Sequence, residues 1–324
     1  MKKSKILRIV TLVILIMIAN SAFAQEKTEP AREEPVSRWE PTVLTPINLY
    51  DTFTFDEKNQ TTVRTSMYIF GPAFVTVWGL VEWGWFSGHS FKVHPTDVWG
   101  ADALDGGSDK LGHMFGAYTA KRAATFLFRA SGDSRLKANL MGAAYAEVVT
   151  LILEFGDGLS TAYGFDPWDV VGNNVGILAG FLLDQFPVLD RMFALQCEWI
   201  PSKKFRKNFE PFTQNSDVFT DYSGQKILLA TKLGGIPYLS RTPLRYLNVD
   251  LGYYARGYYN NYYKSNTQNL YLGLSVNYSI AFGDLLPTGY TSSTFQSIFN
   301  YYHVPLTLEA KKWELVRVPN NDEF

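Results

Sequence analysis

Between Asp109 and Gly176 the sequence sets an unusual number of ionisable and amide side chains among apolar, helix-forming residues. A buried charge is costly unless it is paired or hydrogen-bonded. Such a stretch therefore forms either a polar network that holds helices together or a functional site. The residues in it that could carry catalysis are Asp109, His113, Glu154, Asp157, Asp169 and Asn173.

Three pairs of polar residues in this stretch are spaced to share one face of a helix: Asp109 with His113, Glu147 with Glu154, and Asp169 with Asn173. A carboxylate four residues before a histidine can orient the imidazole through one ring nitrogen and leave the other nitrogen free. That arrangement serves both general-base catalysis and metal binding. Lys110 could neutralise a nearby carboxylate or extend its ammonium group outward.

The sequence leaves three uses of this polar set open. We favour a structural or binding network between helices in apolar surroundings. The second use is a divalent metal site, with His113, Glu154 and Asp169 as candidate ligands, or a proton-handling site. The third is a hydrolytic site with Glu154 and Asp157 as acid and base, although no nucleophile stands out beside them. The spacing matches no standard metal motif, and we expect no other cofactor-binding residues.

Apolar stretches predict the helices that must position these residues, over residues 66–86, 108–129, 134–155 and 167–186. The Ser108-Asp109 pair is suited to cap the second helix. Asp166 is suited to cap the fourth helix, which opens with Pro167.

Glycines are expected to shape two of these helices. Gly156-Asp157-Gly158 is expected to end the third helix. Gly172, Gly176 and Gly180 stand four residues apart in the fourth helix, which predicts a smooth groove for close helix packing.

After Pro201 the hydrophobic period changes to two, which predicts strands over residues 225–233, 246–254 and 270–282. In the last of these, leucines alternate with small or polar residues, as in a strand of an outer-membrane barrel with its apolar side outward. Three or four strands are too few for a barrel, which needs about eight. We therefore expect the sheet to pack on the helices or to lie against a membrane.

These elements predict an α+β protein, in which an N-terminal helical bundle, membrane-associated or embedded, precedes a C-terminal antiparallel β-rich region. The expected organisation is a signal peptide over residues 1–24, a linker or arm over 25–65, a helical domain over 66–200 and a β-rich region over 201–324. The signal is indicated by basic residues before an apolar run, followed by the small-x-small pattern Ala22-Phe23-Ala24. A retained amphipathic anchor is the alternative.

Composition narrows the class of protein and of partner. The net charge of -1 provides no basic field for nucleic acid. Cys197 is the single cysteine, so no disulfide can form within the chain. Aromatic residues make up 15% of the sequence, and such rings favour membrane interfaces. We expect membrane lipid or another envelope component as the partner, at the outer membrane or on the periplasmic face of the envelope of a Gram-negative bacterium.

Several motifs together resemble the YfiM-like family of envelope proteins, domain of unknown function 2279, over about residues 80–190. They are Trp85-Phe86-Ser87-Gly88-His89, Ser108 to His113, Glu154 with Asp157-Gly158, and Gly164 to Asp169 followed by Asn173 to Gly176. The resemblance implies an envelope location. Many members are thought to be lipoproteins, whereas this chain lacks a lipobox cysteine. The order Asp-Lys-x-x-His, then Glu, then Asp-x-x-x-Asn-x-x-Gly is also similar, more weakly, to VanZ-like membrane proteins.

The function expected from these features is that of an exported envelope protein that binds lipid or another envelope component, or has a structural role. The alternative is a metal-dependent or acid–base enzyme acting on a lipid or a cell-wall intermediate. The hypothesis of a functional site requires that Asp109, His113, Glu154, Asp169 and Asn173 converge in space.

Overall fold

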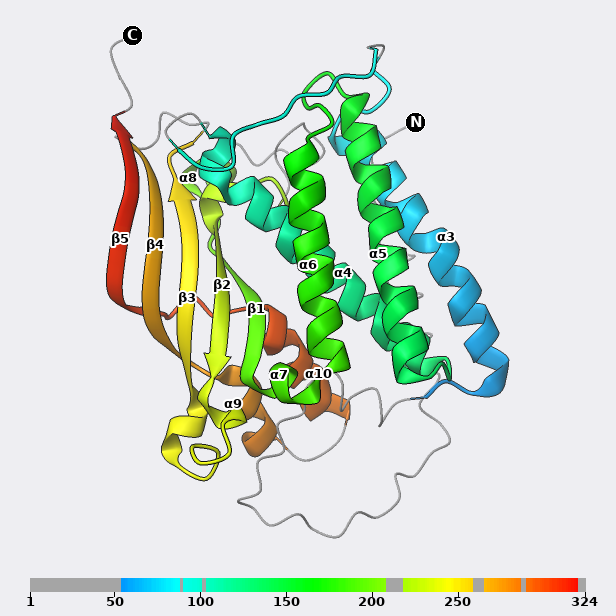
Figure 1. Cartoon of the computed structure of the whole chain (residues 1–324), viewed down its shortest axis with the longest axis vertical. Coiled ribbons are helices and arrows are strands. Elements are labelled where there is room, and N and C mark those ends of the chain that lie inside the picture. The colour runs from blue at the N-terminus through cyan, green and yellow to red at the C-terminus, as the bar shows by residue number, and fades with distance from the viewer. Residues whose placement is uncertain are drawn as a thin grey trace.

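The computed structural model describes residues 54–87, 90–100, 103–207, 218–258, 265–286 and 290–319. The expected signal peptide and most of the expected arm lie outside these residues. Within them, long helices come first and a five-stranded antiparallel sheet follows, which confirms the α+β class. The sheet and the long helices lie side by side (Figure 1).

The long helices are α3 (Glu57–Glu82), α4 (Ser108–Ala130), α5 (Arg135–Gly158) and α6 (Pro167–Gln185). α4 packs against both α5 and α6, and α3 packs on α5 at the side away from the sheet (Figure 1). Gly176 brings α6 directly onto α4, since a Cβ there would lie 2.0 Å from the carbonyl oxygen of Met114. Gly172 and Gly180 also face α4, so the predicted groove is confirmed.

The first two long helices differ from the predicted ones at their starts. α3 begins at Glu57, inside the segment expected to be a linker. α4 has Gly107 rather than Ser108 at its cap position, with a φ of 76° that favours glycine. Ser108 is instead the first helical residue, and its hydroxyl accepts a hydrogen bond from the backbone N–H of Ala255.

Of the boundaries predicted for the other two long helices, the end of α5 is wrong and the cap of α6 is confirmed. α5 continues through Gly156 and Gly158, contrary to the prediction that these glycines end it. Gly156 serves packing instead, because a Cβ there would lie 2.3 Å from the ring of Trp85. The Asp166 cap of α6 is confirmed, since its side chain accepts a hydrogen bond from the backbone N–H of Trp168.

The sheet has the order β1-β2-β3-β4-β5, and all neighbouring strands are antiparallel. The strands are β1 (Phe193–Trp199), β2 (Gln225–Lys232), β3 (Leu247–Arg256), β4 (Ser265–Val276) and β5 (Leu308–Pro319). β2 and β3 confirm two predicted strands, whereas β1 and β5 were outside the predicted set. The remaining elements are α7 (Pro187–Met192), α8 (Lys203–Lys207), α10 (Tyr290–Tyr301) and the 3-10 turns η1 (Leu104–Gly107), η2 (Tyr222–Gly224), η3 (Leu233–Gly235) and η4 (Pro243–Tyr246).

The strand predicted over residues 270–282 is correct only as far as Val276. The Asn277 side chain accepts a hydrogen bond from the backbone N–H of Ile280 and begins helix α9 (Tyr278–Leu285). Asparagine is favoured at this position because its oxygen satisfies a donor that the first helical turn leaves unpaired. A helix cap therefore overrides the period-two pattern of residues 278–282.

The sheet has an apolar outer face and a largely small or polar inner face. Leu229, Leu251 and Leu272 are partners across β2, β3 and β4, and their exposed fractions are 42%, 47% and 40%. Asp250 and Gly273, partners on the inner face, are buried. The inner side of the sheet contacts α4 and α10. The predicted alternation, apolar outward and small or polar inward, is confirmed for this part of the sheet.

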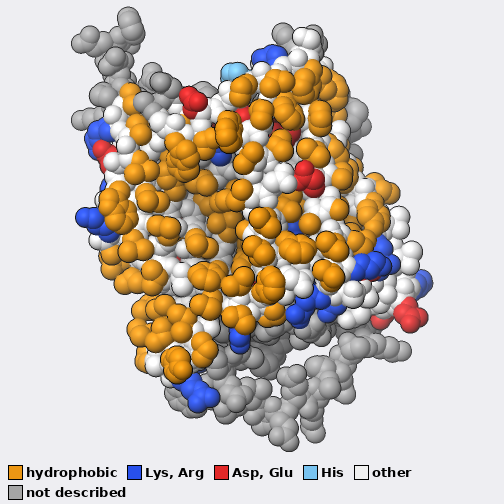
Figure 2. Space-filling model, viewed as in Figure 1, with side chains coloured by type: hydrophobic (Ala, Val, Ile, Leu, Met, Phe, Trp, Pro, Cys, Tyr) orange, Lys and Arg blue, Asp and Glu red, His pale blue; other side chains and the backbone are white. Residues whose placement is uncertain are grey.

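The helical layer repeats this arrangement. Val171, Val175 and Leu178 of α6 are 48–57% exposed, whereas Lys121 and Arg122 of α4 are fully buried. Apolar side chains gather across one broad face, over both the sheet and the helices (Figure 2). Within the described residues, α5 is the one helix long and apolar enough to cross a membrane.

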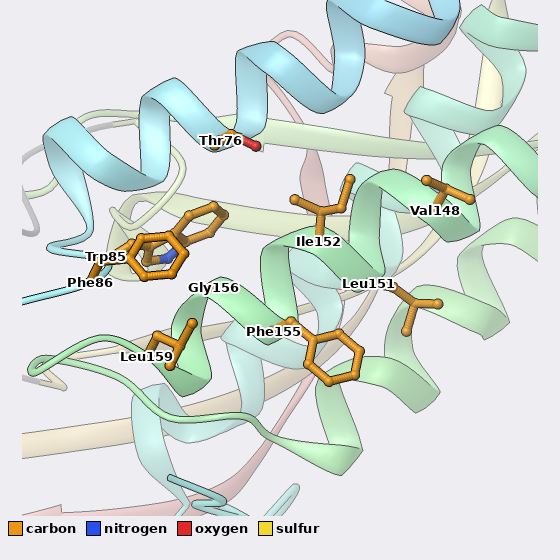
Figure 3. Close-up of a pocket in the computed structure, with 9 residues that line it drawn as sticks. All are labelled: Thr76, Trp85, Phe86, Val148, Leu151, Ile152, Phe155, Gly156 and Leu159. Carbon is orange, nitrogen blue, oxygen red and sulfur yellow. The ribbon is translucent and has the colours of Figure 1, made fainter. Parts of the chain in front are cut away.

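An apolar groove of about 380 Å³ lies between α3 and α5 (Figure 3). Trp85 and Phe86 close one end of it, and Ile152 and Phe155 of α5 line its length. The indole of Trp85 lies against Gly79 of α3 and Gly156 of α5, where any larger residue would collide with the ring.

Candidate functional site

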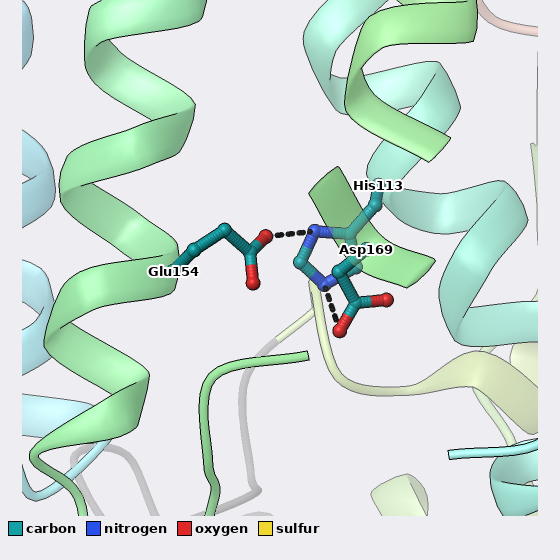
Figure 4. A group of neighbouring side chains, drawn as sticks. All are labelled: His113, Glu154 and Asp169. Atoms are coloured by element: carbon teal, nitrogen blue, oxygen red, sulfur yellow. Dashed lines mark ion pairs between the residues drawn. The ribbon is translucent and has the colours of Figure 1, made fainter. Parts of the chain in front are cut away.

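The polar residues singled out in the sequence converge where α4, α5 and α6 meet. His113 lies on the second turn of α4, Glu154 near the end of α5 and Asp169 in the first turn of α6. Their side chains point toward one another from the three helices (Figure 4). The convergence expected from the spacing is therefore present, and we call this group with Asp109, Lys110, Asp166 and Asn173 the His113 cluster.

His113 lies between two carboxylates. Its Nδ1 is 3.1 Å from Oε1 of Glu154, and its Nε2 is 3.8 Å from Oδ2 of Asp169 (Figure 4). The Asn173 amide donates a second hydrogen bond to the same Glu154 oxygen, at 2.9 Å. Glu154 Oε1 is thus held from both α4 and α6, whereas Oε2 is buried without a hydrogen-bond partner among the described residues.

Lys110 is the second basic group of the cluster. Its Nζ lies 2.8 Å from Asp109, 2.7 Å from Asp166 and 2.8 Å from Asp169. The side chain is buried, so Lys110 neutralises carboxylates rather than extending outward. Asp166 joins this ion pair to the start of α6, because its other oxygen caps that helix.

Asp157 and Glu147 do not join the ion pairs of the cluster. The Trp85 indole N–H donates to Oδ1 of Asp157 at 2.7 Å, which ties α5 to the wall of the apolar groove. Glu147 is half-buried, and within the described residues it forms no ion pair with His113 or Lys110. The predicted pairing of Glu154 and Asp157 as acid and base therefore has no direct contact to support it.

Burial and charge shift the protonation equilibria of these groups. Burial lowers the pKa of His113, but Asp169 and Glu154 outweigh that effect and raise it to about 10. Burial raises the pKa of Asp157 to about 7, against the hydrogen bond from Trp85. Burial likewise raises the pKa of Glu154 and of Asp109, partly opposed by His113 and Lys110. His113 therefore carries a positive charge at neutral pH and lies between the carboxylates of Glu154 and Asp169.

Carboxylates outnumber basic groups in the cluster. Among the described residues, the ion pairs of Asp109, Glu154, Asp166 and Asp169 are made with two basic groups, Lys110 and His113. One nitrogen of His113 and one oxygen each of Glu154 and Asp169 lie within 4.8 Å of one another. A nitrogen with two carboxylate oxygens suits a divalent cation, and the same groups could act as general acid and base.

Every residue of the His113 cluster falls within one region that is shared with other proteins. Residues 97–185 match DUF2279, a family described as predicted periplasmic lipoproteins. The resemblance to domain of unknown function 2279 is confirmed over this DUF2279 segment, and an exported envelope location agrees with the family description. The similarity to VanZ-like proteins is not seen in this match. No curated protein and no solved structure matches the chain.

A second buried charge cluster, which was not predicted from the sequence, lies in the DUF2279 segment except for Asp190. Arg122 Nε lies 2.9 Å from Asp184, and its Nη2 lies 2.7 Å from Asp190. Lys121 lies 2.6 Å from Asp184, so we call this group the Arg122 cluster. Two adjacent basic residues inside an otherwise apolar helix, with an acid near the end of α6, were the available sequence signal.

Proposed function

We propose that this chain is an exported envelope protein that binds membrane lipid through its outward apolar surface. The observation that carries the proposal is the distribution of side chains, with leucine and valine outside and ionisable groups inside both layers. Fully buried Lys, Arg and Asp are rare in water-soluble domains, and large exposed apolar patches mark membrane or protein contacts.

The outer surface contains long stretches without charge. Residues 65–81 in α3, 170–183 in α6 and 265–283 from β4 into α9 hold no Asp, Glu, Lys or Arg. The two helical stretches are about 20–25 Å long at 1.5 Å per residue. That length approaches the roughly 30 Å thickness of a bilayer's hydrocarbon region, and it supports lipid as the occupant.

The groove between α3 and α5 supports an acyl chain as one part of the ligand. Its lining is apolar, with Ile152 and Phe155 along its length. Trp85 separates it from Asp157, and its indole N–H is already bonded to that carboxylate. An alkyl chain in this groove would therefore lie beside the polar residues of α5 without requiring a polar partner.

Flotation with vesicles of phosphatidylethanolamine and phosphatidylglycerol tests the proposal. The purified full chain should float with the vesicles after detergent removal and remain bound through an alkaline wash. Leu251→Arg on the sheet and Leu178→Arg on α6 should weaken binding, since an arginine facing hydrocarbon costs about 2–4 kcal/mol.

The matched control is Asn174→Arg, which places the same charge at an exposed position of α6 that is already polar. It should weaken flotation less than Leu178→Arg does. A wild-type chain that stays monomeric without detergent and does not float would contradict the proposal.

The convergence of His113, Glu154 and Asp169 favours a second candidate function, an acid–base or metal-dependent enzyme acting on a lipid or cell-wall intermediate. His113→Gln should then abolish the activity or cellular phenotype while the protein level is unchanged. A network role alone predicts that the same variant lowers the protein level.

A further inference from the structure

We propose that His113, Glu154 and Asp169 bind one divalent transition-metal ion, with Zn²⁺ and Mn²⁺ as the best-fitting ions. This inference does not depend on lipid binding. The three residues come from α4, α5 and α6, and one ligand atom from each lies within 4.8 Å of the others. Metal-bound ligand atoms in a tetrahedral site are about 3.3–3.5 Å apart for bonds of 2.0–2.1 Å. The most widely separated ligand atoms would therefore need to approach by up to about 1.5 Å.

An unsatisfied oxygen points independently to a missing cation. Glu154 Oε2 has no hydrogen-bond partner among the described residues, and the Glu154 side chain is only 1% exposed. A buried acceptor without a partner is costly. The Glu154 carboxylate faces the imidazole of His113, and Asp169 lies at the other ring nitrogen (Figure 4). A cation held by the three side chains would satisfy the free oxygen.

Charge balance gives the second reason. Lys110 already pairs with three carboxylates at 2.7–2.8 Å, so His113 is the only basic group among the described residues that pairs with Glu154. A divalent ion would offset the carboxylate excess without requiring a charged imidazolium, because a metal binds the neutral ring.

The neighbours of the three ligands would orient them. Asn173 donates to Glu154 Oε1 and leaves Oε2 available. Lys110 pairs with Asp169 Oδ1, whereas Oδ2 is the oxygen that faces His113. Such partners of ligating carboxylates fix the geometry of metal sites and raise their affinity.

A similar group elsewhere in the chain supplies a matched control. His303 lies 3.6 Å from Glu198 and 3.8 Å from Asp250, and all three side chains are buried. Among the described residues, however, only the His113 group brings three ligand atoms within 4.8 Å of one another. His303→Gln should therefore leave metal binding intact.

The experiment uses the full chain in detergent after dialysis against a chelator, titrated with ZnCl₂ and MnCl₂ by calorimetry. Wild type and His303→Gln should bind one ion per chain. His113→Gln and Glu154→Gln should bind at least about 100-fold more weakly, as expected when a ligand rather than its neighbour is removed. Added ZnCl₂ should raise the melting temperature of wild type and His303→Gln but not of the two ligand variants.

A measurement on wild type alone covers the case in which a ligand variant fails to fold. Co²⁺ added to the chelator-treated protein should give the visible absorption of a four- or five-coordinate ion, and ZnCl₂ should displace it. Wild-type binding no stronger than that of His113→Gln, or the absence of this absorption, would overturn the proposal. Loss of binding in His303→Gln as well would also overturn it, because the ion would then not be specific to the His113 cluster.

Discussion

The two buried charge clusters lie toward opposite ends of α4 and use the same partner helix, α6, yet their charge balance differs. In the Arg122 cluster, Lys121 and Arg122 face Asp184 and Asp190, so bases match acids. Lys232 lies nearby, and burial lowers its pKa to about 8. In the His113 cluster, acids outnumber bases. We therefore interpret the Arg122 cluster as a lock between helices and the His113 cluster as the metal site proposed above.

Buried ionisable groups can have two different roles, depending on whether acids and bases match. Buried ion pairs that are matched hold elements in one arrangement, at a considerable desolvation cost. An unmatched set needs another group to balance it, which makes it a candidate for a functional site. The His113 cluster fits the second description, and the Arg122 cluster fits the first.

The largest expected effect is at Arg122. Arg122→Gln leaves Asp184 and Asp190 buried without their guanidinium partner. We expect a loss of about 3–5 kcal/mol in the free energy of unfolding. Denaturant unfolding followed by circular dichroism would measure it.

Lys137→Gln is the control for this change, since Lys137 is 61% exposed and its partner Asp133 keeps an ion pair with Arg64. Its cost should not exceed about 1 kcal/mol. Equal losses in the two variants would mean that the Arg122 cluster does not lock the helices.

The next effect concerns the contact of α4 and α6 between the two clusters. Gly176→Ala places a Cβ 2.0 Å from the Met114 carbonyl oxygen, so the helices must separate. We expect a loss of about 1–3 kcal/mol in the free energy of unfolding. Gly116→Ala, where a Cβ would have no neighbour within 4 Å, should be neutral or stabilising. A neutral Gly176→Ala would show that the two helices are not held this closely.

A smaller effect is expected in the pH dependence of stability near the His113 cluster. Burial raises the pKa of Asp157 to about 7, so the folded state binds a proton that the unfolded state releases at lower pH. Stability relative to Asp157→Asn should therefore be greatest below the unfolded pKa and fall as pH rises toward 7. Unfolding of both proteins at pH 4 to 8, in chelator, would test this, and a constant or rising difference would contradict it.

Part of the His113 cluster could be predicted from the sequence, and the rest of the two clusters could not, for physical reasons. The four-residue spacing of Asp109 and His113 indicated a shared helix face, and Asp166-Pro167 indicated a helix start; both are local features. Whether Glu154 meets them depends on how α5 packs on α4, which spacing along one helix does not determine. The Arg122 cluster was missed because Asp190 lies beyond α6, in α7.

The strands show the same limit of prediction from local sequence patterns. β4 was predicted from its alternation, but β5 carries charged residues such as Lys311 and Lys312 that obscure the period. β1 is buried at three consecutive positions, so its pattern does not alternate either. Only the cap at Asn277, a single local hydrogen bond, decided where β4 gives way to helix.

The smallest expected effect is at His113 itself. His113→Gln should cost only about 1 kcal/mol in the metal-free protein, because the glutamine amide can still donate to Glu154 Oε1. Unfolding in chelator would measure this, next to Arg122→Gln. If His113→Gln lost as much free energy of unfolding as Arg122→Gln, His113 would also be a structural residue. The two clusters would then not differ in role.

The most direct test of the account is anomalous diffraction at the zinc edge from crystals of the full chain grown with ZnCl₂. The account predicts one strong peak within bonding distance of His113, Glu154 and Asp169, and none at Asp184 or Asp190. An empty His113 cluster, or an ion bound in the Arg122 cluster instead, would contradict it.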